Sequence, residues 1–257
     1  MRPSTQNQAL SALLFLYRGV LGSDLAGLPP IVRARTPERL PVVLGRQEVQ
    51  ALLAQLTGTM RPVVTLLYGA GLRLEECLGL RVKDFDFERD QITVRQGKGQ
   101  KDRVTVLPAA AKEALRSHLA EVRRIHDRDQ SNGLGRVALP HAIDWKYPSA
   151  ATDWKWQFVF PAGRICRDAR FGAPSRYHIH ESAVQKAVAQ AARQAGITKR
   201  VGPHTLRHCF ATHLLEAGYD IRTVQELLGH RDVRTTMTYL HVMGRGALGV
   251  RSPADRL

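Results

Sequence analysis

Clear strand-like alternation of apolar and polar residues occurs in one stretch of the chain, residues 81–108, which restricts the folds open to this sequence. Three short alternating runs centre on Phe85, Ile92 and Val104, and the sequences ERD and GKGQ between them are typical of tight turns. Neighbouring strands joined by tight turns pair antiparallel. The stretch therefore predicts a small three-stranded antiparallel sheet.

The sequence on both sides of this stretch has the apolar spacing of amphipathic helices. We expect helices at 46–57, 60–68, 72–80, 109–125, 180–195, 203–217, 220–228 and 233–240. Residues 127–136 are predicted to be a loop, whereas residues 137–176 show no simple period and contain all three tryptophans. The predicted fold class is therefore mostly α with a small three-stranded antiparallel sheet (α+β).

A proline-rich segment separates the N-terminal residues from the rest. A helix expected at 6–21 ends at Gly22, and four prolines follow by residue 41, among several basic residues. Residues that precede proline favour extended backbone, so this segment predicts a linker. The sequence thus divides into an N-terminal helical segment at 1–28, a linker at 29–41 and a main domain at 42–257.

Lysine and arginine outnumber aspartate and glutamate by 38 to 23 in this 257-residue chain, giving a formal net charge of +15. Such an excess favours a polyanionic partner, nucleic acid first and an acidic membrane surface second. The three cysteines form no C-x-x-C pair, which argues against a disulfide framework or a zinc ribbon and favours a reducing compartment. No apolar run approaches the roughly 18 residues of a transmembrane helix, so we expect a cytoplasmic protein.

The expected helix at 203–217 carries residues suited to an anion. Gly202 and Pro203 are typical of a helix start, which places His204 in the first turn and Arg207 one turn later on the same face. The free N–H groups of a helix N-terminus and a guanidinium together favour a phosphate. This helix is therefore a candidate phosphodiester site.

A zinc site is the alternative interpretation of the same helix, because His204 and His208 are four residues apart. A zinc-protease helix carries glutamate directly after its first histidine, and here that position is Thr205. The cationic Arg207 would also stand beside the metal. The residues favour phosphate over zinc.

Two further helices follow, and they bring two more candidates. Asp220 and Asp232 are suited to cap their N-termini, and Gly229 is suited to end the first, which leaves His230 in the turn between them. The last helix contains three threonines, which are weak helix formers, and Tyr239 follows them. A marginal segment can move, as a nucleophile that must reach its substrate requires.

Upstream, two basic residues occur in glycine-rich contexts. Arg73 follows a glycine-rich turn, and Glu76 is placed either to orient Arg73 or to pair with Arg81. Lys98 lies at the tip of the predicted hairpin RQGKGQKDR. This hairpin lacks the G-x-x-x-x-G-K-[ST] pattern of a P-loop, so it does not predict nucleotide binding.

Six positions resemble the active-site residues of the tyrosine recombinase (phage integrase) family in residue type, order and spacing. They are Arg73, Lys98, His204, Arg207, His230 and Tyr239, with 23 residues from Arg207 to His230 and nine from His230 to Tyr239. The sequences GITKRVGPHTLRH and GYDIRTVQELLGH, and the insertion at about 137–162, are similar to the integron integrase subgroup. The resemblance spans roughly residues 36–257.

The resemblance implies a site-specific DNA recombinase that integrates or excises gene cassettes and needs neither a metal nor a cofactor. Tyr239 would attack the scissile phosphate to give a 3′-phosphotyrosyl link, and Arg73 and Arg207 would stabilise charge on the phosphate oxygens. The other expected roles are proton acceptor for His204 and general acid for Lys98, whereas His230 would either hydrogen-bond the phosphate or support the site.

The implied partners are a duplex attachment site and a folded single-stranded cassette site, bound by a homotetramer in the bacterial cytoplasm, with no membrane. In integron integrases an insertion like that at 137–162 helps to bind bases that project from the folded strand. Trp154 and Trp156 offer aromatic faces for such bases, and Lys155 lies between them for the backbone. The alternative for the two tryptophans is packing within the domain.

The resemblance also bears on the domain organisation. Residues 1–28 are similar to the last helix of the family's core-binding domain, which implies that the remainder of that domain is absent before the catalytic domain at 42–257. One alternative is a truncated DNA-binding remnant without recombination activity. Another is a tyrosine recombinase of the phage or chromosome-dimer type.

Overall fold

The computed structural model describes residues 3–23, 32–34, 41–95, 102–140, 143–166 and 174–240. The chain divides into two compact units, Met1–Leu40 and Pro41–Leu257, which we describe separately.

Within its described residues, the first unit has one helical segment. Helix α1 spans Pro3–Phe15 and continues into a π-helical turn, η1, at Leu16–Val20. Gly22 then adopts a positive φ of 61°, which favours glycine and ends the segment as predicted. The side-chain amide of Asn7 bonds both backbone groups of Ala34. Its Nδ2 donates to the carbonyl of Ala34 (2.8 Å), and its Oδ1 accepts from the Ala34 N–H (2.9 Å).

The described part of the second unit is mostly helical with one small sheet, which confirms the predicted fold class. Its elements are α2 (Arg46–Ala54), α3 (Met60–Gly69), α4 (Leu74–Leu78), η2 (Val82–Asp84), β1 (Phe85–Asp86), β2 (Gln91–Val94), β3 (Arg103–Val106), α5 (Ala109–Ser131), α6 (Ile143–Lys146), η3 (Pro148–Thr152), η4 (Trp154–Trp156), α7 (Glu181–Gln194), α8 (Pro203–Glu216), α9 (Ile221–Leu228) and α10 (Val233–Met237).

The sheet has the strand order β1-β2-β3 and is antiparallel throughout, as the alternation predicted. Phe85 pairs with Ile92, and Ile92 pairs in turn with Thr105. Ile92 is fully buried in the core, and the hydroxyl of buried Thr105 donates to the carbonyl of Ala70 at 2.9 Å. This bond fastens the sheet to the turn that precedes α4.

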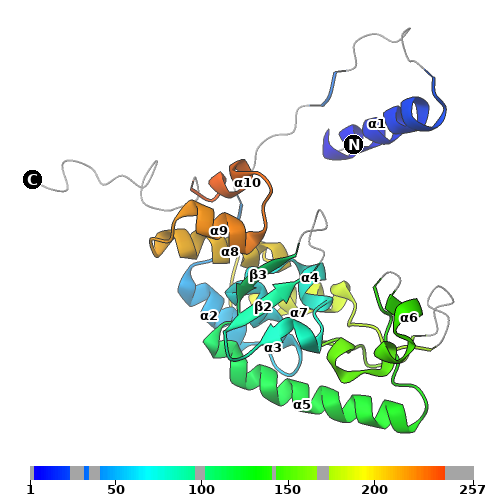
Figure 1. Ribbon diagram of the computed structural model, residues 1–257. Helices are drawn as coiled ribbons and strands as arrows, with labels where there is room; N and C mark the ends of the chain where they lie inside the picture. The colour runs from blue at the N-terminus through cyan, green and yellow to red at the C-terminus, as the bar shows by residue number, and fades with distance from the viewer. Residues whose placement is uncertain are drawn as a thin grey trace, which may run out of the picture. The chain divides into compact units, whose positions relative to one another are not determined.

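Helix α3 lies at the centre of the core because nearly all of its surface is apolar. Val63, Val64, Leu66 and Leu67 are all fully buried, and α3 packs against α5, α7 and α8. In Figure 1 the sheet lies between α5 below it and α9 and α10 above it. A second apolar cluster joins α8 and α9 and includes Tyr239. Helices α8, α9 and α10, with the candidate residues on or beside them, therefore lie together at one end of the unit.

Several helix boundaries differ from the prediction, and for the ends of α5 and α10 the structure gives the reason. The loop expected at 127–136 is wrong for residues 127–131, because α5 continues to Ser131. The buried carboxylate of Asp129 pairs with Arg176 at 2.6 and 2.9 Å, so this polar stretch has a distant partner that the local sequence does not reveal. The last helix ends at Met237, since the N–H of Tyr239 bonds the carbonyl of Thr236 (3.1 Å) in a tighter turn.

No helix within the described residues is both long enough and apolar enough to cross a membrane.

Candidate active site

Arg207 is the central side chain of the candidate site, and α8 buries it. The helix begins as predicted, with Gly202 extended at the N-cap and Pro203 in the first turn. The side chain of Arg207 is only 5% exposed. Its guanidinium donates to the carbonyls of Gly71 and Leu228, the latter at 2.6 Å. One bond is to the turn before α4 and the other is to the last residue of α9, and together they fix the plane of the guanidinium.

Arg73 is the N-cap residue of α4 and has an extended backbone. The turn before it requires glycine, because Gly71 has a φ of 62° and a Cβ there would lie 2.3 Å from Phe210. Arg73 Nη1 donates to Glu76 Oε1 at 2.6 Å, and the Arg73 N–H donates to Glu76 Oε2 at 2.8 Å. Glu76 therefore orients Arg73, which was one of its two predicted roles.

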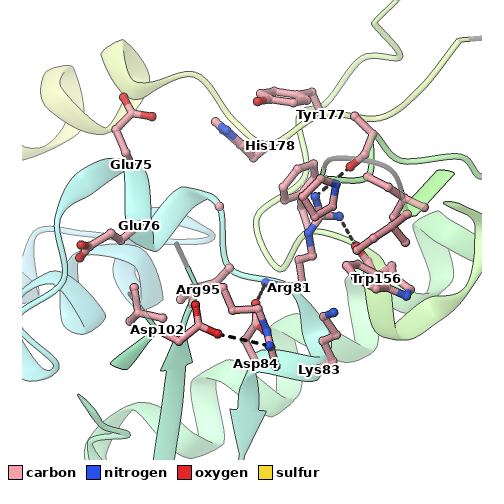
Figure 2. Close-up of a pocket in the computed structure, with 18 of the residues that line it drawn as sticks. Glu75, Glu76, Arg81, Lys83, Asp84, Arg95, Asp102, Trp156, Tyr177 and His178 are labelled. Atoms are coloured by element: carbon pink, nitrogen blue, oxygen red, sulfur yellow. Dashed lines mark hydrogen bonds and ion pairs between the residues drawn. The ribbon is translucent and has the colours of Figure 1, made fainter. Parts of the chain in front are cut away.

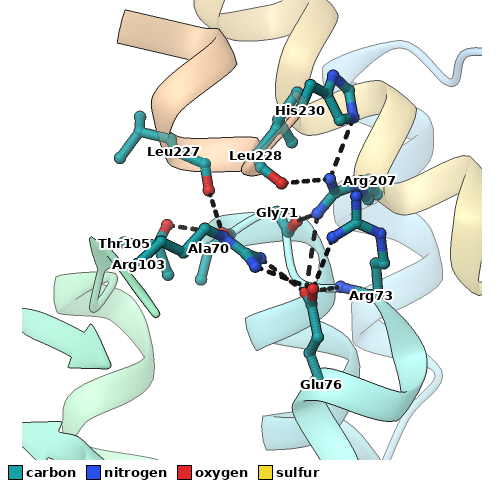
Figure 3. Close-up of polar contacts among 10 residues, drawn as sticks. All are labelled: Ala70, Gly71, Arg73, Glu76, Arg103, Thr105, Arg207, Leu227, Leu228 and His230. Carbon is teal, nitrogen blue, oxygen red and sulfur yellow. Dashed lines mark hydrogen bonds and ion pairs between the residues drawn. The ribbon is translucent and has the colours of Figure 1, made fainter. Parts of the chain in front are cut away.

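The other predicted partner of Glu76, Arg81, makes different contacts. Its guanidinium donates to the carbonyls of Trp156 (2.6 Å) and Ala138 (2.8 Å). Arg103 of β3 pairs with Glu76 instead, at 2.9 and 2.6 Å. The four residues Arg73, Glu76, Arg103 and Arg207 are called the arginine cluster below, and Figure 3 shows the three guanidinium groups around the one carboxylate.

The electrostatics of Glu76 follow from this arrangement. Its side chain is 8% exposed, and burial by itself raises the pKa of a carboxyl group. The hydrogen bonds and charge of Arg103, followed by the bonds from Arg73, outweigh burial and lower the pKa of Glu76 to about 2. Glu76 is therefore a carboxylate throughout the neutral range, and it balances part of the positive charge.

His230 lies directly after Gly229, whose φ of 65° ends α9 as predicted. Its Nε2 lies 3.2 Å from Arg207 Nη2 and its Nδ1 lies 3.0 Å from the hydroxyl of Thr236. Burial first, and then the charges of Arg207 and Arg73, lower the pKa of His230 to about 4. Because a guanidinium only donates, Nε2 must accept, which places the proton of the neutral ring on Nδ1.

Tyr239 lies just beyond α10, at the edge of the arginine cluster. The residue is 4% exposed and packs with Phe210 and Leu228. Its hydroxyl lies 3.2 Å from Nδ1 of His208, and its ring centroid is 6.2 Å from that of His230. Burial raises the pKa of Tyr239, although Arg207 and Arg73 act in the opposite direction.

The three histidines of α8 have different surroundings. His204 is exposed, and no hydrogen bond among the described residues joins it to Tyr239. His208 contacts the tyrosine, and burial, followed by the charges of His204 and Arg207, lowers its pKa. His213 bonds the hydroxyl of Tyr68 (2.9 Å) and the carbonyl of Leu44 (3.0 Å), so it supports the core.

Local sequence patterns do not reveal the contact of His208 with Tyr239 or the pairing of Arg103 with Glu76. Each joins residues far apart in the chain: 31 positions separate His208 from Tyr239, and 27 separate Glu76 from Arg103. The position of His208 directly after Arg207 is the one local feature that indicates a place near the candidate site.

Lys98 lies between β2 and β3, outside the described residues. The zinc alternative gains no support from the part of the chain that is described, where no group of three or more metal-binding side chains comes together.

A pocket of about 780 Å³ opens beside the arginine cluster, with Arg73 and Glu76 at its border. Its other walls carry aromatic, basic, acidic and aliphatic side chains, and we call it the aromatic pocket; Figure 2 shows among them Arg81, Lys83, Arg95, Asp102, Trp156, Tyr177 and His178. Lys83 Nζ lies 3.0 Å from the centroid of the Trp156 ring. Burial, followed by the charge of Arg95, lowers the pKa of Lys83 to about 8.

The two candidate tryptophans for base stacking lie in different surroundings. Trp156 lines the aromatic pocket. Trp154 packs against α5, with its ring centroid 5.8 Å from that of His126 and 5.1 Å from the guanidinium of Arg123. Lys155, between them, pairs with Asp153 at 3.0 Å.

Known proteins share this sequence and fold. The sequence model of the phage integrase family matches residues 43–245. An integrase/recombinase from Escherichia coli is 51% identical over 254 residues, which cover 99% of this chain and 75% of the relative. The crystal structure of XerA recombinase superimposes with a TM-score of 0.58 at 27% identity, covering all of this chain and 75% of its own. XerH recombinase bound to palindromic difH substrate, in a post-cleavage complex, has a TM-score of 0.63 at 23% identity, covering 95% of this chain and 65% of its own. The match to most of the chain and the close relative show that this protein belongs to the phage integrase family, the tyrosine recombinases.

Proposed function

We propose that this protein is a site-specific recombinase that cleaves and rejoins DNA through a 3′-phosphotyrosyl intermediate at Tyr239. The observation that carries the proposal is the joining of Arg73, Arg207 and His230 through hydrogen bonds and the ion pairs of Glu76, with residues drawn from α4, α8 and the turn after α9 (Figure 3). Tyr239 borders this group through its contacts with His208 and His230. DNA as the partner is supported by the net charge of +15 and by the DNA-bound state of the structural neighbour XerH.

The arginine cluster suits a phosphate in its transition state. Charge grows on the non-bridging oxygens during attack, and two fixed guanidinium groups stabilise it without the cost of reorganisation. Arg73 and Arg207 would bind these oxygens, while Glu76 keeps Arg73 in place. His230, with its proton on Nδ1 and its Nε2 facing Arg207, would hold that guanidinium in place, and a bond to a phosphate oxygen would require a proton on Nε2. These roles need no metal ion.

The two proton transfers are assigned to different residues. The hydroxyl proton of Tyr239 moves to an imidazole as its oxygen attacks phosphorus, and the bond from phosphorus to the 5′-oxygen breaks. The resemblance assigns this imidazole to His204, but the 3.2 Å contact favours His208, so we propose His208 as the immediate acceptor. His204, in the first turn of α8, would then bind the phosphate. Lys98 would protonate the departing 5′-oxygen.

Within the family we propose an integron integrase, which joins a duplex attachment site to a folded single-stranded cassette site as a tetramer in the bacterial cytoplasm. The aromatic pocket supports this assignment, because a projecting base needs an aromatic face with a cation nearby, as Trp156 and Lys83 provide. The second candidate is a chromosome-dimer recombinase, which the likeness to XerA favours. Equal binding to a folded strand and to duplex of the same sequence would support that candidate.

A nicked suicide substrate tests the proposed chemistry, because the free 5′-end diffuses away and traps the covalent complex. We expect an SDS-resistant adduct with the protein, none with Tyr239→Phe, and an undiminished adduct with Tyr219→Phe. Tyr219 is an exposed tyrosine between α8 and α9 and serves as the matched control. DNA binding without any adduct would identify a DNA-binding remnant instead, and an adduct with Tyr239→Phe would contradict the assignment of the nucleophile.

A further inference from the structure

Arg103 is a third arginine of the candidate site, and the chemistry proposed above gives it no role. It is the first residue of β3, and its side chain is 10% exposed. Its Nη1 and Nη2 donate to the two oxygens of Glu76 at 2.9 and 2.6 Å, in a bidentate pair. Its Nε donates to the carbonyl of Leu227, in the last turn of α9, at 3.0 Å. One side chain thus joins the sheet, α4 and α9 (Figure 3).

The first of these contacts controls Arg73. Glu76 accepts from Arg103 with both oxygens, and it accepts from the side chain and N–H of Arg73 with the same two oxygens. A carboxylate shared in this way has one position that satisfies both guanidinium groups. The place of Arg73 therefore depends on Glu76, and the place of Glu76 depends on Arg103.

The second contact controls the approach to His230. Arg103 bonds the carbonyl of Leu227, and Arg207 bonds the next carbonyl, that of Leu228. Two cations on successive carbonyls at a helix C-terminus stabilise that end of the helix. Gly229 leaves room for this arrangement, because a Cβ there would lie 2.7 Å from Cδ of Arg103. The backbone that leads into His230 is therefore held in one position.

We propose that Arg103 is a positioning residue of the reaction, which holds Glu76 and the end of α9 so that Arg73 and His230 address the same phosphate. The inference rests on the proposed function and adds to it. Arg103 acts through these neighbours rather than on the DNA.

Arg103→Lys tests the proposal, because lysine keeps the charge and loses the planar pair of bonds. Arg176→Lys is the matched control. Arg176 also forms a bidentate pair with a buried carboxylate, Asp129, and its side chain is 12% exposed. It also donates to a carbonyl, that of Ala162, at 2.6 Å. The two arginines differ in that one belongs to the arginine cluster and the other does not.

The readouts are the single-turnover rate of adduct formation, noncovalent DNA binding and the melting temperature. Rates are measured well below the melting temperature of each variant. We expect Arg103→Lys to slow adduct formation by about 100-fold, since a small misplacement of catalytic groups has an effect of this order, with DNA binding largely retained. Arg176→Lys should leave the rate close to that of the original protein.

The pH profile separates positioning from a loss of stability. The charged groups around Glu76 are Arg73 on its own helix, Arg103 of β3 and Arg207 of α8, with His230 beyond Arg207. The other elements packed on α4, namely α3 and α7, contribute residues of the apolar core. Without the bidentate pair, burial raises the pKa of Glu76, and the ionised form that orients Arg73 is lost as the pH falls.

In Arg103→Lys the rate should therefore begin to fall at a higher pH than in the original protein, where protonation of His208 causes the fall, and Glu76→Gln in the same background should remove this difference. If Arg103→Lys matches Arg176→Lys in rate, or slows the reaction with an unchanged pH profile, Arg103 is not a positioning residue. Failure of the proposed function looks different, because the original protein would then form no adduct at all.

Discussion

The arginine cluster and the aromatic pocket lie next to each other, and both contain arginines, yet the two are built in different ways. In the cluster, Arg103 and Arg207 are almost fully buried and bond to a carboxylate or to backbone carbonyls. In the pocket, the side chain of Arg95 is 47% exposed, and Lys83 rests on the face of Trp156. The cluster has one arrangement, whereas the pocket keeps an open volume of about 780 Å³.

This difference assigns different tasks to the two regions. Catalysis of phosphoryl transfer needs charges that are in place before the reaction begins, and buried bidentate bonds provide them. Selection of a flexible or projecting group needs room and aromatic surface, which an open pocket provides. We therefore expect changes in the cluster to slow cleavage of every substrate, and changes in the pocket to alter the choice between substrates.

The largest effect is expected for Arg207→Ala. The change removes a phosphate ligand and leaves the carbonyls of Gly71 and Leu228 without their donor. Adduct formation should fall by about 1,000-fold on duplex and folded strand alike, and unfolding should become easier by about 2 kcal/mol. Suicide-substrate rates and thermal unfolding measure the two effects. A loss of rate on only one of the two substrates would contradict the assignment of catalysis to the arginine cluster and of substrate choice to the aromatic pocket.

A smaller effect is expected for His208→Ala, which removes the group in contact with the hydroxyl of Tyr239. General-base catalysis contributes a factor of about 100 or more, so the adduct rate should fall by that order. His213→Ala is the control on the same helix; its bonds to Tyr68 and Leu44 predict lower stability with the rate retained.

A substrate with sulfur in place of the 5′-bridging oxygen identifies which proton transfer is lost. A thiolate leaves without protonation, so this substrate should restore the rate of Lys98→Ala but not that of His208→Ala. If this substrate restored the rate of His208→Ala, His208 would instead be the residue that protonates the departing 5′-oxygen. If His204→Ala shows the deficit expected of His208→Ala while His208→Ala reacts normally, His204 is the acceptor.

The smallest effect is expected in the aromatic pocket. Trp156→Ala should weaken binding of a folded strand with a projecting base by about tenfold relative to duplex, the loss of one stacking contact. Trp154→Ala should lower stability without changing this ratio, because Trp154 packs on α5. Fluorescence anisotropy with both DNA forms measures the ratio. Equal effects of the two substitutions would remove the distinction between a binding tryptophan and a packing one.

The sequence predicted the parts of the fold that local chemistry determines. Asp220 caps α9, Gly229 ends it with a positive φ, and Asp232 caps α10, each through contacts within a few residues. The sheet also followed from local alternation and turns. The end of α5 did not, because the stability of its last turn depends on Arg176, 47 residues from Asp129.

The candidate site divides along the same line. The resemblance identified the residues that would touch the phosphate, but local sequence left two partners open for Glu76 and gave none for Arg103 or His208. Those pairings depend on how α4, β3, α8 and α10 come together. Burial decides them, since a buried carboxylate must find its cations and a buried hydroxyl must find an acceptor.

Identification of the residue that carries the DNA tests the central claim most directly. The adduct from the suicide substrate is digested with protease and nuclease, and mass spectrometry locates the residue that retains the 3′-phosphate. The structure predicts Tyr239, which lies against His208 and His230 at the edge of the arginine cluster. Linkage to another residue, such as Tyr219 or Tyr177, would show that the cluster described here is not the site of the reaction.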